Sequence, residues 1–159
     1  PGQLADKNHM WIDNSTSSPY EGNIYVAWTD FGGFNDQHVV VSSSSDNGET
    51  WTPLKEISSG ASNAFSHGVN LTTGPNGEVY AAWAIYNGTG LTESAIGIAK
   101  SLDGGQTWTA SMAIDNIYGI RDYGTSKNMR VNSFPVVDCD ISDGENSGNL
   151  YITWGNRGV

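Results

Sequence analysis

An eight-residue pattern, Ser-x-Asp-x-Gly-x-Thr-Trp, occurs twice in this chain and constrains its fold more than any other feature. The first copy runs from Ser44 to Trp51 and the second from Ser101 to Trp108. Asp followed by Asn-Gly or Gly-Gly is typical of a hairpin turn, because Asn and Gly accept positive φ angles at little cost. The Asp carboxylate can accept hydrogen bonds across its own turn, and the Trp opens the next strand. The repetition predicts a supersecondary unit that occurs at least twice.

We expect the fixed residues of both copies to have structural roles. They are Ser44, Asp46, Gly48, Thr50 and Trp51 in the first copy, and Ser101, Asp103, Gly105, Thr107 and Trp108 in the second. Exposing an indole ring to water is costly, so we also expect both Trp side chains to be largely buried.

A second repeat consists of a turn glycine followed by a strand rich in aromatic and β-branched residues. It occurs at Gly22–Trp28, Gly77–Trp83 and Gly148–Trp154. The two repeats together predict two four-stranded units, 9–57 and 67–114, an insertion at 115–133, and an incomplete unit at 134–159. The expected strands are 9–13, 23–29, 37–43 and 51–57, then 67–72, 78–84, 94–100 and 108–114, and finally 134–139 and 149–154.

The octapeptide resembles the Asp-box, or bacterial neuraminidase repeat, of sialidase-like β-propellers. The resemblance implies an all-β fold, namely a partial β-propeller of four-stranded antiparallel blades with Asp-box turns, here about two and a half blades. A closed ring needs about four to eight blades, so we expect a truncated segment that self-associates or is completed by further blades. The segments Asp6–Asp13 and Arg130–Pro135 are also similar to large secreted bacterial propellers. This implies a secreted or cell-surface location.

The composition excludes some classes of partner. The formal net charge of −10 disfavours nucleic acid, whose phosphates require a basic surface. No stretch is long and apolar enough to predict membrane insertion. Cys139 is the single cysteine, so no disulfide can form within the chain.

The resemblance also implies that ligands bind on the face opposite the boxes. By strand parity, the insertion 115–133 lies on that face. It carries our candidate ligand-binding residues, Arg121, Tyr123, Lys127 and Arg130, in a chain with seven Lys and Arg. A long loop with aromatic and cationic groups is a common place for function. The alternative is a solvated insertion with scattered charges.

The leading functional hypothesis is recognition of a carbohydrate or glycoconjugate without catalysis by this segment. A sialidase needs three arginines around the substrate carboxylate, a Tyr nucleophile and an Asp acid, the known exception to the two-carboxylate scheme. All three arginines of this chain follow the second box. The candidates for a partial catalytic site are Asp30 or Asp36 as the acid and Arg130 as a group that binds the substrate carboxylate. Two alternatives stay open: an exo-glycosidase acting on sialic-acid-like sugars in a longer protein, and a structural module for protein contacts.

An acidic run near the end of the chain suggests calcium at first sight. Asp138, Asp140 and Asp143 offer oxygen ligands at nearly alternate positions, but Asp143 occupies the place where an EF-hand loop requires Gly. We therefore expect a polar turn here and no cofactor. His9 and His67 are expected at equivalent positions of the first strands of their units, where they satisfy backbone groups rather than bind a metal. The alternative is that the two facing histidines contribute to a ligand site.

Overall fold

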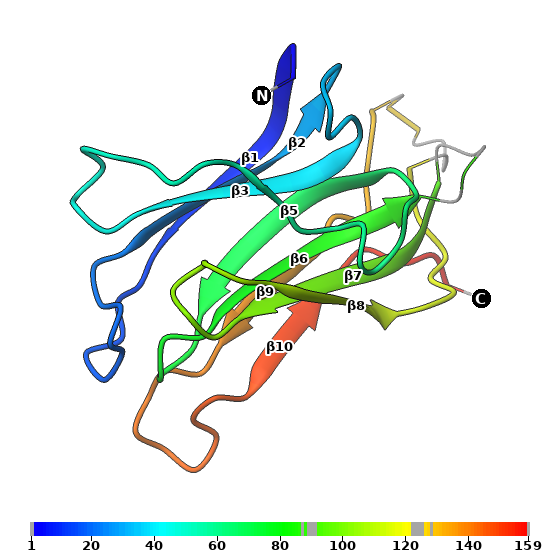
Figure 1. Ribbon diagram of the computed structural model, residues 1–159. Coiled ribbons are helices and arrows are strands. Elements are labelled where there is room, and N and C mark those ends of the chain that lie inside the picture. Colours follow the sequence, from blue (N-terminus) through cyan, green and yellow to red (C-terminus); the bar gives the residue numbers. More distant parts are fainter. Residues whose placement is uncertain (1, 87, 89–91, 122–125, 128, 159) are drawn as a thin grey trace.

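The computed structural model describes residues 2–86, 88, 92–121, 126–127 and 129–158, and these form ten β-strands and no helix. Two four-stranded antiparallel sheets follow one another along the chain, and a two-stranded sheet comes last (Figure 1). Sheet 1 is built from β1 (Leu4–Ile12), β2 (Ile24–Phe31), β3 (His38–Ser44) and β4 (Lys55–Glu56). Sheet 2 is built from β5 (Ser66–Thr73), β6 (Val79–Tyr86), β7 (Glu93–Ser101) and β8 (Thr109–Ile114). Sheet 3 pairs β9 (Val136–Cys139) with β10 (Leu150–Thr153).

The strand bounds differ from the sequence prediction mainly at two places. The first strand begins at Leu4 rather than residue 9, and a register shift between Asp6 and His9 lies within it. The fourth strand of sheet 1 has two residues instead of the predicted 51–57. The fourth strand is short because of its pairing with β3: the Thr52 hydroxyl accepts the Ser43 N–H at 3.0 Å in place of a backbone carbonyl. Pro53, which follows, has no N–H to donate.

Both octapeptides form tight turns between the third and fourth strands of their sheets. Asn47 and Gly48 have φ angles of 59° and 87°, the positive values that a type I′ turn requires. The Asp46 carboxylate accepts hydrogen bonds from the Thr50 N–H at 2.9 Å and from the Ser44 hydroxyl at 2.7 Å. The second turn repeats these contacts. Because the Thr50 side chain and backbone both donate to it, the pKa of Asp46 is lowered to about 2.

The prediction that both box tryptophans are largely buried is wrong for Trp51, which is 44% exposed. Trp51 and Trp108 make the same local contact, each donating its Nε1–H to the carbonyl of the turn glycine at 3.1 Å. Trp108 is half-buried because it packs against the core between the sheets. Trp51 lies on the outer side of sheet 1, where the described residues include no further sheet to cover it.

The main core lies between sheets 1 and 2. One face of sheet 1 contributes Tyr25, Ala27, Val39 and Val41, and the facing side of sheet 2 contributes Leu71, Val79, Ala81, Trp83 and Ala99. A second contact joins the other face of sheet 2 to sheet 3, where the Val137 N–H donates to Asn70 Oδ1 at 2.9 Å. The sheets are therefore packed face to face in chain order (Figure 1).

The strand registers give the molecule two distinct ends. Ile24 pairs with Ser44, and Val79 pairs with Ser101, so each box lies at the same end as the first turn of its sheet. The Lys55 ammonium donates to the Gln106 carbonyl at 2.5 Å, so the two boxes lie at one end of the molecule. We call this the box end. The connections 32–37, 57–65 and 115–135 leave from the other end.

Candidate functional site

A pocket of about 390 Å³ opens at the end opposite the boxes. Its walls come from β1, from the end of β2, from the start of β5 and the loop before it, and from the segment between β8 and β9. It is lined by Asp6, Lys7, Phe31, Phe65, His67, Arg121, Arg130, Val131, Asn132 and Phe134. Residues far apart in the sequence thus form one concave surface, which is how ligand pockets are usually built.

Aromatic rings form the apolar part of this pocket. The Phe65 ring stacks on His67 with 5.3 Å between centroids, and Phe31 lies 5.8 Å from Phe65. Phe134 meets His67 edge-on at 5.1 Å. Phe134 reaches this position only because residue 68 is glycine: a Cβ there would lie 2.2 Å from the Phe134 ring.

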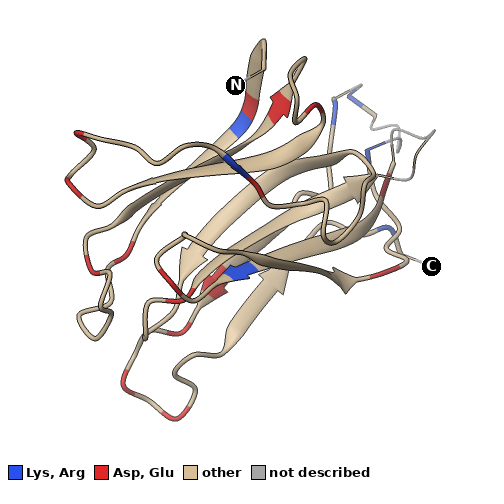
Figure 2. Ribbon diagram, viewed as in Figure 1, with Lys and Arg blue, Asp and Glu red and all other residues tan. Residues whose placement is uncertain are grey.

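The polar part of the pocket is cationic. Lys7, Arg121 and Arg130 oppose the single carboxylate of Asp6, which leaves the lining at a net +2 with His67 neutral. The whole chain carries −10, and in Figure 2 the loops of the box end carry acidic residues. Nearby charges act within the screening length of physiological salt, about 8 Å, so an anion in the pocket experiences mainly its lining. This pocket therefore favours a ligand with a negative group and an apolar or ring face.

His67 is neutral in this setting. Its Nε2 lies 3.6 Å from Asp6 Oδ2, and its Nδ1 lies 2.9 Å from the Thr29 hydroxyl. Burial lowers the pKa of His67 to about 4; Asp6 opposes this, and Arg121 adds to it. A second cause of the low pKa is therefore the positive potential of the pocket itself.

The segment 115–135 is held in place by one buried carboxylate, that of Glu93, which is 1% exposed. Its Oε1 accepts the Ser133 N–H at 3.0 Å and the Tyr86 hydroxyl at 3.2 Å, and its Oε2 accepts the Arg121 N–H at 3.3 Å. The Glu93 carbonyl accepts the Gly119 N–H at 3.1 Å. Both ends of the segment are thereby fixed to sheet 2, and with them the two arginines that it brings to the pocket.

Arg121 is further oriented by Tyr86. Its guanidinium carbon lies 5.6 Å from the Tyr86 ring centroid, and its Nη1 donates to the Tyr86 hydroxyl at 3.3 Å. Burial raises the pKa of Tyr86, so its hydroxyl stays protonated. The hydroxyl donates a hydrogen bond to Glu93 Oε1. Lys7 has a φ of 53° and holds its ammonium 5.9 Å from the Phe134 ring centroid. Non-glycine residues adopt this conformation at some cost, and such residues cluster at functional sites.

The residues predicted from sequence fall in different places. Arg121 and Arg130 both line the pocket, whereas Lys127 is exposed and is not part of its lining. Tyr123 lies outside the described residues. Asp30 is buried and accepts the Gly2 N–H at 2.7 Å.

Asp36 accepts the Gly32 N–H at 2.8 Å, and like Asp30 it does not line the pocket. The suggested arrangement of an aspartic acid with Arg130 is thus not assembled here. Sequence reasoning missed Asp6, Lys7 and the phenylalanines, which reach the pocket only through long-range packing.

Two carboxylates of the acidic run near the end of the chain accept hydrogen bonds, one from another sheet and one from within the run. Asp138 Oδ1 accepts the Thr72 hydroxyl at 3.2 Å, and Asp140 Oδ1 accepts the Ser142 N–H at 2.8 Å. Asp143 is exposed. Among the described residues, no group of three or more His, Cys, Asp or Glu side chains is arranged to hold a metal ion.

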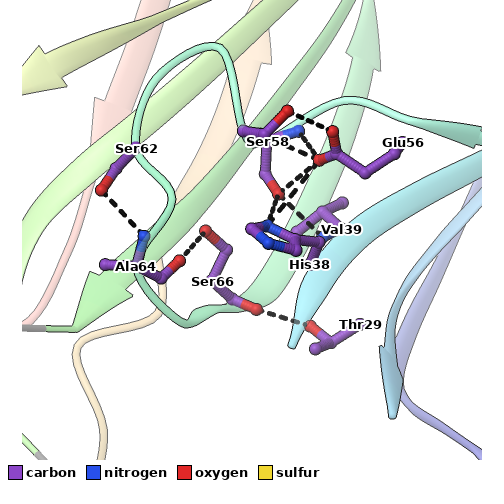
Figure 3. Close-up of polar contacts among 9 residues, drawn as sticks. Thr29, His38, Val39, Glu56, Ser58, Ser62, Ala64 and Ser66 are labelled. Atoms are coloured by element: carbon purple, nitrogen blue, oxygen red, sulfur yellow. Dashed lines mark hydrogen bonds and ion pairs between the residues drawn. The ribbon is translucent and has the colours of Figure 1, made fainter. Parts of the chain in front are cut away.

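Ser58, His38 and Glu56 form a hydrogen-bonded cluster at the start of the loop 57–65 (Figure 3). The contacts of Ser58 are those of a structural residue and not of a catalytic nucleophile. Ser58 is fully buried; its hydroxyl donates to Glu56 Oε1 at 2.8 Å and accepts the Val39 N–H at 3.0 Å. His38 Nδ1 lies 3.2 Å from the same hydroxyl. Burial raises the pKa of Glu56, but hydrogen bonds from Ser59 and Ser58 outweigh this and leave it lowered. The cluster fixes the start of the loop 57–65 to β3, and Phe65 at the end of this loop lines the pocket.

The prediction that His9 and His67 are equivalent is wrong. His9 pairs with Ala27 and His67 pairs with Ala84, whereas the repeat aligns Ala27 with Ala82. His9 does satisfy a backbone group, since its Nδ1 accepts the Leu71 N–H at 3.1 Å. His67 instead forms part of the pocket.

In the comparisons with known proteins, no family model matches this chain, and no curated protein matches it. Among the residues that the structure describes, no helix is long and apolar enough to cross a membrane.

Proposed function

We propose that this chain is a carbohydrate- or glycoconjugate-recognising segment of a secreted or cell-surface sialidase-like β-propeller. In this proposal 9–57 and 67–114 are blades, 115–133 is an insertion that helps to form the ligand site, and 134–159 begins a third blade. Support for the propeller comes from the two Asp-box turns and from face-to-face packing of successive antiparallel sheets. Self-association or further blades complete the ring.

One observation carries the functional part of the proposal. Arg121, Arg130 and Lys7 meet Phe31, Phe65 and Phe134 in one pocket at the end opposite the boxes. Guanidinium groups bind carboxylates through paired hydrogen bonds, and aromatic faces suit the apolar face of a sugar ring. A carboxylate-bearing sugar satisfies both parts of the lining.

We propose binding without catalysis by this segment. Asp30 and Asp36, the candidates for a catalytic acid, each accept a backbone N–H, and neither lines the pocket. No observation on the described residues favours the glycosidase over the binding protein.

The test is a calorimetric titration with N-acetylneuraminic acid and, separately, with neutral galactose. We expect binding of the acidic sugar that weakens with added salt, and loss of that binding in the Arg121→Ala/Arg130→Ala double variant. Arg157→Ala is the matched control, because Arg157 is an exposed cation that does not line this pocket. Equal binding by the wild type and the double variant would refute the proposal.

A further inference from the structure

The hydrogen bonds around His67 define which of its two ring nitrogens carries the proton. The Thr29 hydroxyl donates to the Ser66 carbonyl at 3.1 Å (Figure 3), and the same hydroxyl oxygen lies 2.9 Å from His67 Nδ1. A hydroxyl has one proton to donate, so an oxygen whose proton points to Ser66 must accept from Nδ1. Because the neutral ring has a single proton, that proton is on Nδ1, and Nε2 keeps its lone pair.

The Ser66 carbonyl requires the proton of the Thr29 hydroxyl. Ser66 is completely buried, and a buried carbonyl without a donor is costly. The neighbouring Phe65 carbonyl accepts the Tyr86 N–H at 2.9 Å, so the Ser66 carbonyl points away from β6. Among the hydrogen bonds of the described residues, that of Thr29 is the one that reaches it. The proton is therefore not free to turn toward His67.

The bare Nε2 of His67 faces a second acceptor in the pocket. Asp6 Oδ2 lies 3.6 Å from it, while Asp6 Oδ1 accepts the Lys7 N–H at 2.8 Å. In the described part of the chain, no donor bonds with Nε2 or Oδ2. The imidazole is held between Phe65 and Phe134, and its side chain is 7% exposed, so it cannot turn to another partner. The Asp6 side chain is 45% exposed, so a donor can approach the two acceptors from the pocket.

We propose that His67 Nε2 and Asp6 Oδ2 bind a neutral hydrogen-bond donor of the ligand, either a hydroxyl or an amide N–H. The acidic group of the same ligand lies against the three cations of the lining. The donor is neutral because a lining of net +2 repels an ammonium group. This inference rests on the proposed function and narrows the ligand to an acid that also carries such a donor. A site of this kind rejects an analogue without the donor, because its polar groups are then left unpaired.

Asp6→Asn separates this proposal from the effect of charge alone. An amide oxygen at this position still accepts the Lys7 N–H, and the NH₂ group takes the place of Oδ2 and donates to Nε2 of His67. Both open acceptors are thereby lost. The lining loses its carboxylate and keeps three cations, so its net charge rises from +2 to +3. Charge alone predicts tighter binding of every anion, whereas the proposal predicts weaker binding of an anion that carries the donor.

The experiment is a calorimetric titration with N-acetylneuraminic acid and with tetrahydropyran-2-carboxylate, which has the same ring and carboxylate but no hydroxyl or amide group. We expect N-acetylneuraminic acid to bind about tenfold more weakly to Asp6→Asn than to the wild type, the effect of one hydrogen bond to a charged group. The donor-free acid should bind more tightly to the variant. Asp143→Asn is the matched control, because it makes the same change in charge at an exposed position outside the pocket lining and should alter neither affinity.

A second readout tests the protonation of His67 without any ligand. The ¹⁵N chemical shifts of its ring at pH 7 should show a protonated Nδ1 and a bare Nε2, and the Nε2 shift should move toward the hydrogen-bonded range when N-acetylneuraminic acid is added. A proton on Nε2, or equal or tighter binding of N-acetylneuraminic acid by Asp6→Asn, would overturn the inference and leave the proposed function standing. If neither acid bound to the wild type, the proposed function would be refuted, and this inference with it.

Discussion

Replacing Glu93 with Gln should release the segment 115–135 from sheet 2. The carboxylate accepts three hydrogen bonds with 1% exposure, from Ser133, Tyr86 and Arg121. A Gln amide has one oxygen, so if that oxygen takes the place of Oε1, its NH₂ group faces the Arg121 N–H and one bond is lost. Hydrogen bonds to charged groups contribute about 1.5–3 kcal/mol each. We expect the free energy of local opening of the segment to fall by about 2 kcal/mol, which raises its opening equilibrium constant about 30-fold.

Native-state hydrogen exchange measures this opening directly, residue by residue. In Glu93→Gln, the amides of Ser133 and Arg121 should exchange about 30-fold faster. Glu78→Gln is the control, because the Glu78 carboxylate accepts the Asn76 N–H at 3.0 Å in a turn at the box end. Unchanged exchange at Ser133 and Arg121 in Glu93→Gln would show that Glu93 does not hold the segment.

Two further predictions concern the pocket. The pKa of His67 is about 4 in the folded chain, because of burial first, and 6.5 is its ordinary value. The unfolded chain therefore binds a proton between these values that the folded chain does not, so stability is full above pH 6.5 and declines toward pH 4. Because of this group, the free energy of unfolding measured with urea should be lower at pH 4.5 than at pH 7 by on the order of 2 kcal/mol, and His67→Gln should lack that part of the difference. An unaltered pH dependence in His67→Gln would contradict this prediction. Gly68→Ala should lower the free energy of unfolding by about 1–3 kcal/mol in urea titrations, because φ at residue 68 is 72° and an added Cβ would clash with the Phe134 ring. Wild-type stability in this variant would contradict the prediction.

Local features of this fold were readable from the sequence. The box turns depend on residues within four positions of one another, such as Asp46 and Thr50, and therefore formed as the pattern predicts. The order of antiparallel strands followed from the same repeats. The length of β4 was not readable, because the role of Thr52 beside Pro53 depends on the strand opposite.

Features that depend on packing between distant segments were not readable. Trp51 and Trp108 have the same local sequence but different exposure, because only Trp108 has a sheet packed beside it. For the candidate site, Arg121 and Arg130 stood out as cations in a long insertion. Asp6 and Lys7 precede every repeat, and no local pattern relates them to residues more than a hundred positions later.

The central claim is that the pocket formed by β1, β5 and the segment 115–135 binds an acidic sugar. Its most direct test is a titration of the isotope-labelled chain with N-acetylneuraminic acid, followed by backbone amide chemical shifts. We predict saturable shifts at Lys7, His67, Arg121 and Arg130, and unchanged amides in the box turns around Asp46 and Asp103. Shifts confined to the box turns, or no saturable shifts at any amide, would contradict the claim.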